Sequence, residues 1–326
     1  MPRVLIFAPS PLLTVTVEGD ASGTDLHVHA GGQGVWQSRM LQTLGAEVAI
    51  CGVLTGESGR VVRHLLEDDD LTVHAVHREG RGGAYVHDRR SGERVEIVEI
   101  AGDPLSRHEL DELYTLTIRE AMTADLVLLS GPVGDEVLPD DVYRRLASDL
   151  TAAGRTVVVD LAGGRLAAAL DGGVRLAKVS DAELEEADAS AGTSVDGLIA
   201  AASRLRDAGA RSVVVTRAGH PAILVDGDEV STVQAPVMEA VDPTGAGDSF
   251  TAALAASLAA GDSLHEAVAL AAAAGALNVT RHGLGTGDGE AIRRLSTQVE
   301  IVRAGREDGE QLSPDDLAGR LEVDER

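Results

Sequence analysis

The chain has 326 residues, of which 44% are hydrophobic, 25% charged and only 2% aromatic, and its formal charge is −25. A chain of this length can bury a large core, which must be built mainly from Ala, Val and Leu. The strong negative charge excludes non-specific binding to nucleic acid or to an anionic membrane.

The single cysteine, Cys51, excludes internal disulfides and multi-cysteine metal sites. The apolar run at residues 4–9 is too short for a signal peptide, and no run reaches the roughly 18 to 20 apolar residues of a membrane span. We therefore expect a cytoplasmic protein with no membrane partner.

Short apolar runs bounded by turn residues recur at residues 4–9, 46–52, 124–131, 155–160 and 211–219. Continuous runs of this kind are typical of parallel strands buried on both faces. Helical patterns lie between them at residues 34–45, 142–154 and 196–209, each ending in a glycine suited to a helix C-terminus. This alternation predicts an α/β fold, doubly wound around a mainly parallel sheet.

Two segments, about residues 12–30 and 82–100, instead alternate apolar and polar residues around Gly or Ser-Gly turns. That pattern predicts antiparallel hairpins with one wet face, which together form a small β-sheet lid. His27 and His29 are expected to be outward lid residues and not metal ligands. We expect one folded domain over residues 1–298 and an acidic C-terminal extension over 299–326.

The string "AVDPTGAGDSF" at residues 240–250 carries the most specific signal. Gly245 and Gly247 can bring backbone N–H groups close to a ligand, and the helical pattern that follows places these groups at a helix N-terminus. Asp248 stands beside this anion hole, where it suits a base that takes a proton from an alcohol while the hole neutralises a phosphoryl group. The alternative is that Asp248 only complements the helix dipole.

Two ordinary nucleotide motifs are missing. No G-x-x-x-x-G-K-[ST] string occurs, which excludes a P-loop, and "GGQG" at residues 31–34 lacks the Rossmann glycine spacing. The 240–250 string resembles instead the C-terminal signature of PfkB-type carbohydrate kinases, the ribokinase-like family, and "GGQGVWQSRMLQTLG" and "VTRHG" extend the similarity over about residues 4–295. "SGERVEIVEIAGDPLS" resembles the phosphofructokinase branch in particular. The resemblance implies a ribokinase-like three-layer fold with a β lid, ATP and Mg²⁺ as cofactors, and a sugar or sugar phosphate as acceptor.

Residue roles follow from that resemblance. Asp248 matches the catalytic base, with Gly245, Ala246 and Gly247 as the anion hole. Glu183 matches the acid of an N-x-x-E element that organises Mg²⁺ through water, with Ser180 in the asparagine position. The other nucleotide positions are Thr216, at the phosphates, Ala218, which replaces a glycine, and Gly283. Asp242 and the turn near Gly283 and Gly285 match a monovalent-cation region that holds K⁺ in some members.

The acceptor side departs from the family. Gly31 and Gly32 keep the helix start, but Leu12 stands where an aspartate is expected, Gln33 where a lysine is expected, and Trp36 where an asparagine is expected. The lid arginine expected to grip an acceptor phosphate is replaced by Gly83, with Arg81 as a shifted substitute. We interpret this pocket as having lost charge and gained apolar bulk. Trp36 serves either as a stacking platform for a ring-shaped acceptor or as a packing residue beside Met40 and Leu44.

The leading hypothesis is ATP-dependent phosphorylation of an alcohol group on a sugar or related small polyol, similar to 1-phosphofructokinase but with an atypical acceptor site. The alternatives are a nucleoside kinase and a non-catalytic metabolite-binding or regulatory protein on the same fold. The resemblance also suggests a homodimer paired through the lid.

Overall fold

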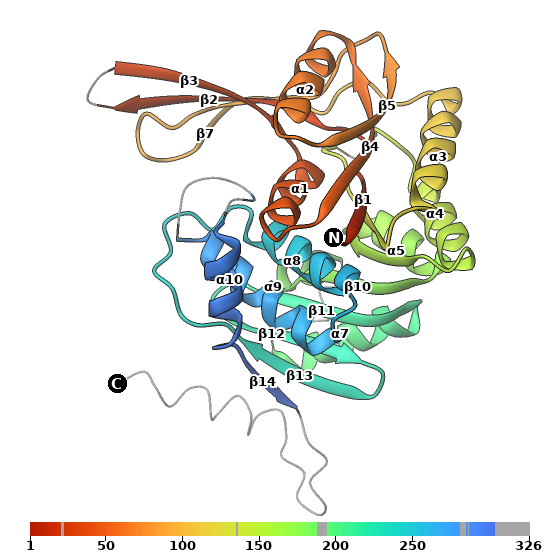
Figure 1. The fold of residues 1–326 in the computed structure, drawn as a ribbon, viewed down its shortest axis with the longest axis vertical. Coiled ribbons are helices and arrows are strands. Elements are labelled where there is room, and N and C mark those ends of the chain that lie inside the picture. Colours follow the sequence, from red (N-terminus) through yellow and green to blue (C-terminus); the bar gives the residue numbers. More distant parts are fainter. Residues whose placement is uncertain (21–22, 135, 188–193, 281–284, 286, 304–326) are drawn as a thin grey trace, which may run out of the picture.

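The computed structural model describes residues 1–20, 23–134, 136–187, 194–280, 285 and 287–303. Figure 1 shows one large sheet wrapped by helices, with a smaller sheet projecting from its upper end. From edge to edge the larger sheet contains β14 (Glu300–Arg303), β13 (Glu229–Gln234), β12 (His220–Asp226), β11 (Ala210–Arg217), β10 (Val174–Ser180), β9 (Thr156–Asp160), β8 (Leu126–Ser130), β1 (Arg3–Phe7), β4 (Glu47–Thr55) and β5 (Thr72–Arg78).

Neighbouring strands from β5 to β11 run parallel, and β11 to β14 run antiparallel. The five apolar runs of the sequence form β1, β4, β8, β9 and β11, so the predicted parallel strands are confirmed. Val157, Val158 and Val159 in β9 are all fully buried, as a strand covered on both faces requires. The sheet also continues past residue 298, because β14 pairs with β13.

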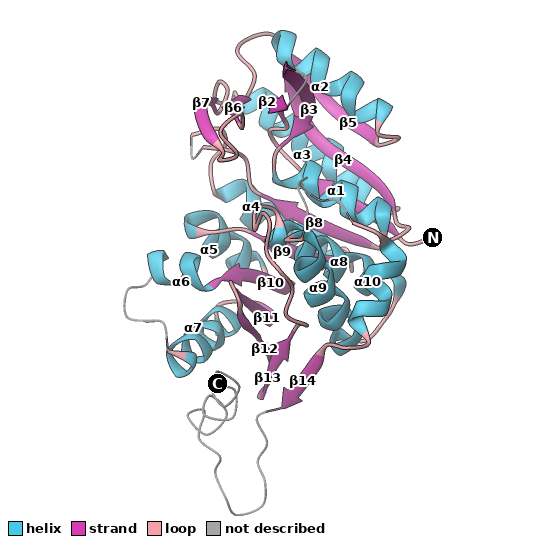
Figure 2. Cartoon of the chain, turned by 90° about the vertical axis from the view of Figure 1, so that its left-hand side faces the viewer, coloured by secondary structure: helices cyan, strands magenta, loops and turns pink. Residues whose placement is uncertain are grey.

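Helices cover both faces of this sheet, as Figure 2 shows. One face carries α1 (Gln33–Thr43), α2 (Gly56–Asp68), α8 (Ala246–Ala260), α9 (Leu264–Asn278) and α10 (Gly289–Ser296). The other carries α3 (Arg107–Ala121), α4 (Asp141–Ala152), α5 (Gly163–Gly172), α6 (Asp181–Ala187) and α7 (Val195–Asp207). The three predicted helices α1, α4 and α7 end just before Gly45, Gly154 and Gly209, which all have positive φ, as expected for glycine beyond a helix end.

The core is rich in alanine, as the composition predicts. The run of residues 252–256 in α8 is buried throughout, and so are residues 271–274 in α9. Small side chains let these two helices lie close to each other and to the sheet. Cys51 is a free, buried residue of β4. No helix in the described ranges is both long and apolar enough to cross a membrane.

The smaller sheet has the strand order β3 (Gly23–Gly31), β2 (Leu12–Asp20), β6 (Ala84–Asp88) and β7 (Val95–Ile100). The two predicted antiparallel hairpins, β2–β3 and β6–β7, are present, and a parallel β2–β6 pairing joins them. The sequence predicts that the polar residues of the hairpins face water. Instead, Thr14, Thr16 and His87 are buried, whereas the apolar Leu26 and Val28 are exposed. The polar face is therefore buried at Thr14, Thr16 and His87, although His27 on the same face is exposed.

The strand order fixes where a ligand can bind. From β1 the chain order runs to β4 and β5 on one side and to β8, β9 and β10 on the other. In open α/β sheets the crevice beyond the carboxyl ends of the strands at such a reversal is the usual ligand site. The residues that follow β1 and β8 are therefore expected to line the ligand site.

Candidate active site

A recess of about 220 Å³ lies at this reversal, beyond the carboxyl ends of β1 and β8 and against the first turn of α1. It is lined by Ala8, Ser10, Pro11, Gly31, Gly32, Gln33, Gly34, Val35, Gly131 and Val133. Gly32 caps α1 with φ 101°, a conformation that favours glycine, and a side chain on Gly34 would collide with Ala8. The predicted Gly-Gly helix start thus forms one wall of the recess.

The glycine turn lies at the N-terminus of α8, as predicted. Gly245 is the N-cap in the left-handed conformation, and Asp248 lies in the first helical turn. Asn278 of α9 fixes the turn, because its Nδ2 donates to the Thr244 carbonyl at 2.9 Å and its Oδ1 accepts from Ser249 Oγ at 3.0 Å. The Ala246 N–H donates to the Pro243 carbonyl at 3.3 Å, and the other N–H groups of a first helical turn have no acceptor within the helix, so this turn can bind an anion.

A buried ion pair lies beneath the turn. Lys178 Nζ of β10 is 3.1 Å from Asp160 Oδ1 at the end of β9, and both side chains are less than a tenth exposed. A Cβ placed on Gly247 would lie 3.1 Å from the same ammonium nitrogen. Thr251 of α8 donates to Asp160 Oδ2 at 2.7 Å. The anion-binding turn therefore has a positive charge directly under its backbone.

This cluster controls the protonation of Asp248. Burial raises the pKa of the Asp248 carboxyl well above its ordinary value, the negative charge of Asp160 raises it further, Lys178 opposes the rise, and Glu183 adds to it. Burial alone would lower the pKa of Lys178, but Asp160, Glu183 and Asp248 outweigh burial and raise it, so the ammonium stays charged. A carboxylate with a raised pKa beside an anion hole is suited to taking a proton from an alcohol.

The predicted nucleotide residues gather at the neighbouring strand ends. Ser180, at the end of β10, pairs in register with Thr216 of β11. Glu183 Oε2 accepts from the Ser180 backbone N–H at 2.7 Å and from its hydroxyl at 2.8 Å. This fixes the Glu183 carboxylate, whose second oxygen can hold a magnesium-bound water, so the oxygen donors here fit Mg²⁺. Ala218 is exposed in the tight turn between β11 and β12, and Gly283 lies outside the described residues.

Only some of the residues predicted to bind the acceptor line the recess. Gln33 lines the recess, and its Oε1 accepts from the Gly131 backbone N–H at 2.8 Å. Leu12 is buried and packs on Gly83 without lining the recess. Trp36 is half-buried on α1, and its indole N–H has no hydrogen-bond partner in the described part of the chain. The indole nitrogen is buried, and Trp36 lines neither this recess nor the adjoining one.

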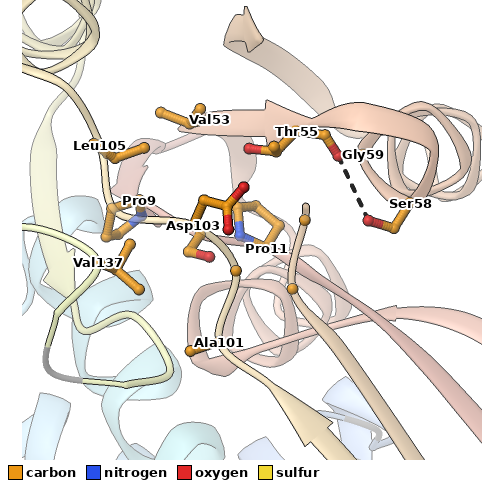
Figure 3. Close-up of a pocket in the computed structure, with 14 residues that line it drawn as sticks. Pro9, Pro11, Val53, Thr55, Ser58, Gly59, Ala101, Asp103, Leu105 and Val137 are labelled. Carbon is orange, nitrogen blue, oxygen red and sulfur yellow. Dashed lines mark hydrogen bonds between the residues drawn. The ribbon is translucent and has the colours of Figure 1, made fainter. Parts of the chain in front are cut away.

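A second recess of about 310 Å³ adjoins the first and shares Ser10 and Pro11 with it. Figure 3 shows the Asp103 carboxylate among its lining residues, with Thr55 and Ser58 nearby. Asp103 Oδ2 accepts from the Arg81 backbone N–H at 2.8 Å, and Oδ1 is 3.5 Å from the Arg81 guanidinium. The arginine expected to bind an acceptor phosphate is thus paired with a carboxylate.

Asp242, the predicted monovalent-cation residue, is also paired. Its Oδ2 accepts from the guanidinium of Arg89, beyond β6 of the lid, at 2.9 Å, and its Oδ1 accepts from the Thr244 backbone N–H at 3.0 Å. The Arg89 and Asp242 side chains are each less than a fifth exposed. This contact ties the lid to the segment that leads into the glycine turn. His27, in contrast, stays on the lid surface beside Asp25, and no cluster of metal-binding residues occurs in the described ranges.

Sequence reasoning missed Gln37, Asp160, Lys178 and Thr251. Two of them leave a signal in the sequence: Asp160 ends a predicted buried strand, and Lys178 is a charged residue between the apolar Ala177 and Val179 of β10. A charge at either place would have to be paired or functional. Gln37 and Thr251 leave no comparable signal, because their partners come from distant parts of the chain.

The chain is similar to known proteins over most of its length. A model described as "pfkB family carbohydrate kinase" matches residues 10–291. The 1-phosphofructokinase of Bacillus subtilis (strain 168) is 26% identical over 84% of this chain and 89% of that protein. The ATP-dependent 6-phosphofructokinase isozyme 2 of Mycobacterium tuberculosis (strain ATCC 25618 / H37Rv) is 27% identical over 90% and 89%. The structure of phosphofructokinase-2 from Escherichia coli in complex with potassium has a TM-score of 0.79 at 25% identity, covering 91% of this chain and 99% of that one.

The electrostatics of Asp248 predict a pH profile. Because a base must be ionised and the Asp248 pKa is raised, kcat/KM should be highest above that raised pKa and fall as the pH drops through it. The acid limb should therefore lie well above the ordinary aspartate value of about 4. A pH–rate series at saturating Mg·ATP measures it, and a limb near pH 4 would contradict the description of this cluster.

Proposed function

Because the chain belongs to the pfkB family of carbohydrate kinases, we propose that it transfers the terminal phosphoryl group of ATP to an alcohol group of a sugar or small polyol, with Asp248 as the base. The observation that carries this proposal is the glycine turn, which combines a helix N-terminus, the Lys178 ammonium and a carboxylate of raised pKa in one place. A binding protein would not benefit from a carboxylate next to a phosphate site, whereas a kinase requires one.

Each group in the site has a proposed task. Asp248 takes the proton of the acceptor hydroxyl as that oxygen bonds to phosphorus and the bond from phosphorus to the ADP oxygen breaks. The backbone N–H groups of residues 245–247, with Lys178 beneath them, stabilise the charge on the transferred group. Mg²⁺, when bound with ATP, supplies further neutralisation of the phosphates. Glu183 would hold that ion through water, and Thr216 lies close enough to Ser180 to share the nucleotide side.

The acceptor path follows α1. Gln37 Nε2 is 3.5 Å from Asp248 Oδ1, and Gln33 lies one helical turn earlier, at the recess. An acceptor lying along this turn would present one hydroxyl to Asp248 and extend its far end toward Asp103 in the second recess. Gln33, Gly31 and Gly32 would contact its middle, whereas Trp36 lines neither recess, which favours a packing role for that residue.

We propose that the far end of the acceptor carries no phosphate. The residues that line the second recess include one carboxylate, from Asp103, and three hydroxyl groups, but no Lys or Arg. Arg81, on its border, is already paired with Asp103, and a phosphate there would face the Asp103 charge. Like charges placed face to face disfavour binding. Sugar hydroxyls, in contrast, can hydrogen-bond to all of these groups.

Potassium is not part of the proposed mechanism. The Asp242 carboxylate accepts from a guanidinium and from a backbone N–H, and Gly283 of the predicted cation region lies outside the described residues, so no step is assigned to a potassium ion. We keep a cytoplasmic setting as a proposal, which the free, buried Cys51 supports.

A homodimer through the lid is the proposed assembly. Val15 lies opposite both Val28 and Val86, and Val17 lies opposite Leu26, so these side chains share one lid face. Leu26 is 59% exposed and Val28 is 42% exposed. An apolar face of this kind on a four-stranded sheet is suited to packing on a second copy of itself.

The catalytic assignment predicts that Asp248→Asn lowers turnover by about 10² to 10⁴-fold while ATP binding stays close to wild type. ADP release from Mg·ATP, measured across sugars, sugar phosphates, polyols and nucleosides, gives the rate and calorimetry gives the affinity. A mutant that keeps near wild-type rate would overturn the role of Asp248. Wild-type protein that binds ATP but releases no ADP with any acceptor would favour a non-catalytic binding protein. A turnover that is highest with a nucleoside would favour a nucleoside kinase.

The acceptor assignment predicts a higher kcat/KM for a free sugar or polyol than for its phosphorylated form. Asp103→Asn keeps an oxygen that can accept from the Arg81 backbone N–H but removes the negative charge. The ratio of kcat/KM for the phosphorylated acceptor to kcat/KM for the free acceptor should therefore rise about tenfold. The matched control is Asp171→Asn, an exposed aspartate of α5. If fructose 1-phosphate proves the best acceptor of the wild type, the interpretation of Leu12, Gln33 and Gly83 is wrong.

The assembly prediction is a dimer in sedimentation velocity that becomes a monomer in Leu26→Lys/Val28→Lys. The lysines would bring buried positive charges together across the two-fold axis. Met122→Lys, at the exposed end of α3, is the control and should leave the mass unchanged. A wild type that remains monomeric at micromolar concentration would contradict the lid interface.

A further inference from the structure

Gln37 is a buried amide in the middle of the reactive cluster. Its side chain comes from α1, is fully buried, and hydrogen-bonds to groups on three other elements. Nε2 donates to Asp160 Oδ2 at 3.1 Å and to Asp248 Oδ1 at 3.5 Å, while Oε1 accepts from Ser130 Oγ at 2.5 Å. A buried amide is unfavourable unless it is hydrogen-bonded, and an apolar residue would pack more simply on a buried helix face. We therefore expect the Gln37 amide to have a function beyond packing.

The partners fix which way the amide points. Ionised carboxylates only accept hydrogen bonds, so the nitrogen end must face Asp160 and Asp248 and the oxygen end must face Ser130. Ser130 is held in turn, because Tyr143 donates its hydroxyl proton to the Ser130 carbonyl at 2.9 Å. A chain of contacts thus runs from the fully buried Tyr143 to the carboxylate beside the anion hole.

Asp248 depends on this amide for its orientation. The charged groups that face it are Asp160 from β9, Lys178 from β10 and Glu183 from α6. Lys178 hydrogen-bonds to Asp160. In the part of the chain that the structure describes, the Gln37 amide is the only side chain that hydrogen-bonds to the Asp248 carboxylate.

We propose that Gln37 is the positioning residue for Asp248: its amide bridges Asp160 and Asp248, holds Oδ1 of Asp248, and leaves Oδ2 to take the proton of the acceptor hydroxyl. This inference rests on the proposed role of Asp248 as the base. The 3.5 Å contact shortens when an acceptor is bound, as catalytic hydrogen bonds commonly do. Asp160 acts as the fixed anchor, because Lys178 binds its Oδ1 and Thr251 donates to the same Oδ2 that accepts from Gln37.

The test compares Gln37→Met, which keeps length and volume but removes both amide groups, with Ser130→Ala, which removes only the hydroxyl that orients the amide. Both should lower kcat, Gln37→Met by about 10 to 100-fold, with little change in the KM for ATP. Loss of a donor to the charged carboxylate should also move the acid limb of kcat/KM upward by about one pH unit in Gln37→Met, and by less in Ser130→Ala.

The control on the same helix is Gln42→Met, whose amide donates to the backbone carbonyl of Asp69 at the surface. It should leave kcat, KM and the acid limb at wild-type values. A readout that needs no acceptor is the ¹³Cγ chemical shift of Asp248 followed against pH, with Asp248→Asn to assign the signal. Its midpoint should rise in Gln37→Met and stay unchanged in Gln42→Met.

Folded Gln37→Met protein with wild-type kcat and an unmoved midpoint would overturn the proposal. So would a loss of kcat matched by an equal change in ATP affinity without a shift in the midpoint, because that pattern indicates a structural role only. If the midpoint of the Asp248 titration moves in Gln37→Met while Asp248→Asn keeps full activity, the hydrogen bond from Gln37 is supported but the role of Asp248 as the base is wrong.

Discussion

The arrangement of the side chains around Asp248 and the glycine turn depends on the buried ion pair between Asp160 and Lys178. Removing two ions from water costs several kcal/mol for each, and their attraction offsets this only when further hydrogen bonds complete the site. Here Thr251 and Gln37 supply them to Asp160. The pair consequently joins β9, β10, α8 and α1 at one point, which is also where the glycine turn and Asp248 meet.

The position of the pair matters more than its contribution to stability. The chain carries a formal charge of −25, which repels phosphates at long range. Lys178 beneath Gly247 provides a local positive charge that water screens little, because its side chain is only 7% exposed. Burial is the largest cause of the raised Asp248 pKa, and the negative charge of Asp160 adds to it while Lys178 opposes it. The two members of the pair therefore act differently: the ammonium favours an anion at the turn, and the carboxylate raises the proton affinity of Asp248.

The sequence predicts the fold well because its signals are local. Buried parallel strands such as β9 are continuous valine runs, and helix ends are marked by glycines such as Gly154, so both can be recognised within a few residues. The glycine turn is predictable for the same reason. The cluster around Asp248 is not, because Gln37 and Asp160 are 123 residues apart and meet only through the strand order. The pairing of Arg81 with Asp103 and of Arg89 with Asp242 also depends on how the lid folds back, which no local pattern records.

The two halves of the site are built from different kinds of structure. The phosphoryl side rests on the ends of buried strands and the first turn of α8, where a change in one residue disturbs several packed elements. The acceptor side is built from the segment after β1, the lid strands and the loop that carries Asp103, where side chains can change with little effect on the core. A family with this division can keep one transfer chemistry and change the molecule that receives the phosphoryl group. Of the three departures from the family, Gln33 and Gly83 line the recesses on this side, whereas Leu12 is buried and lines neither, so we propose that Gln33 and Gly83 bear on which acceptor is used.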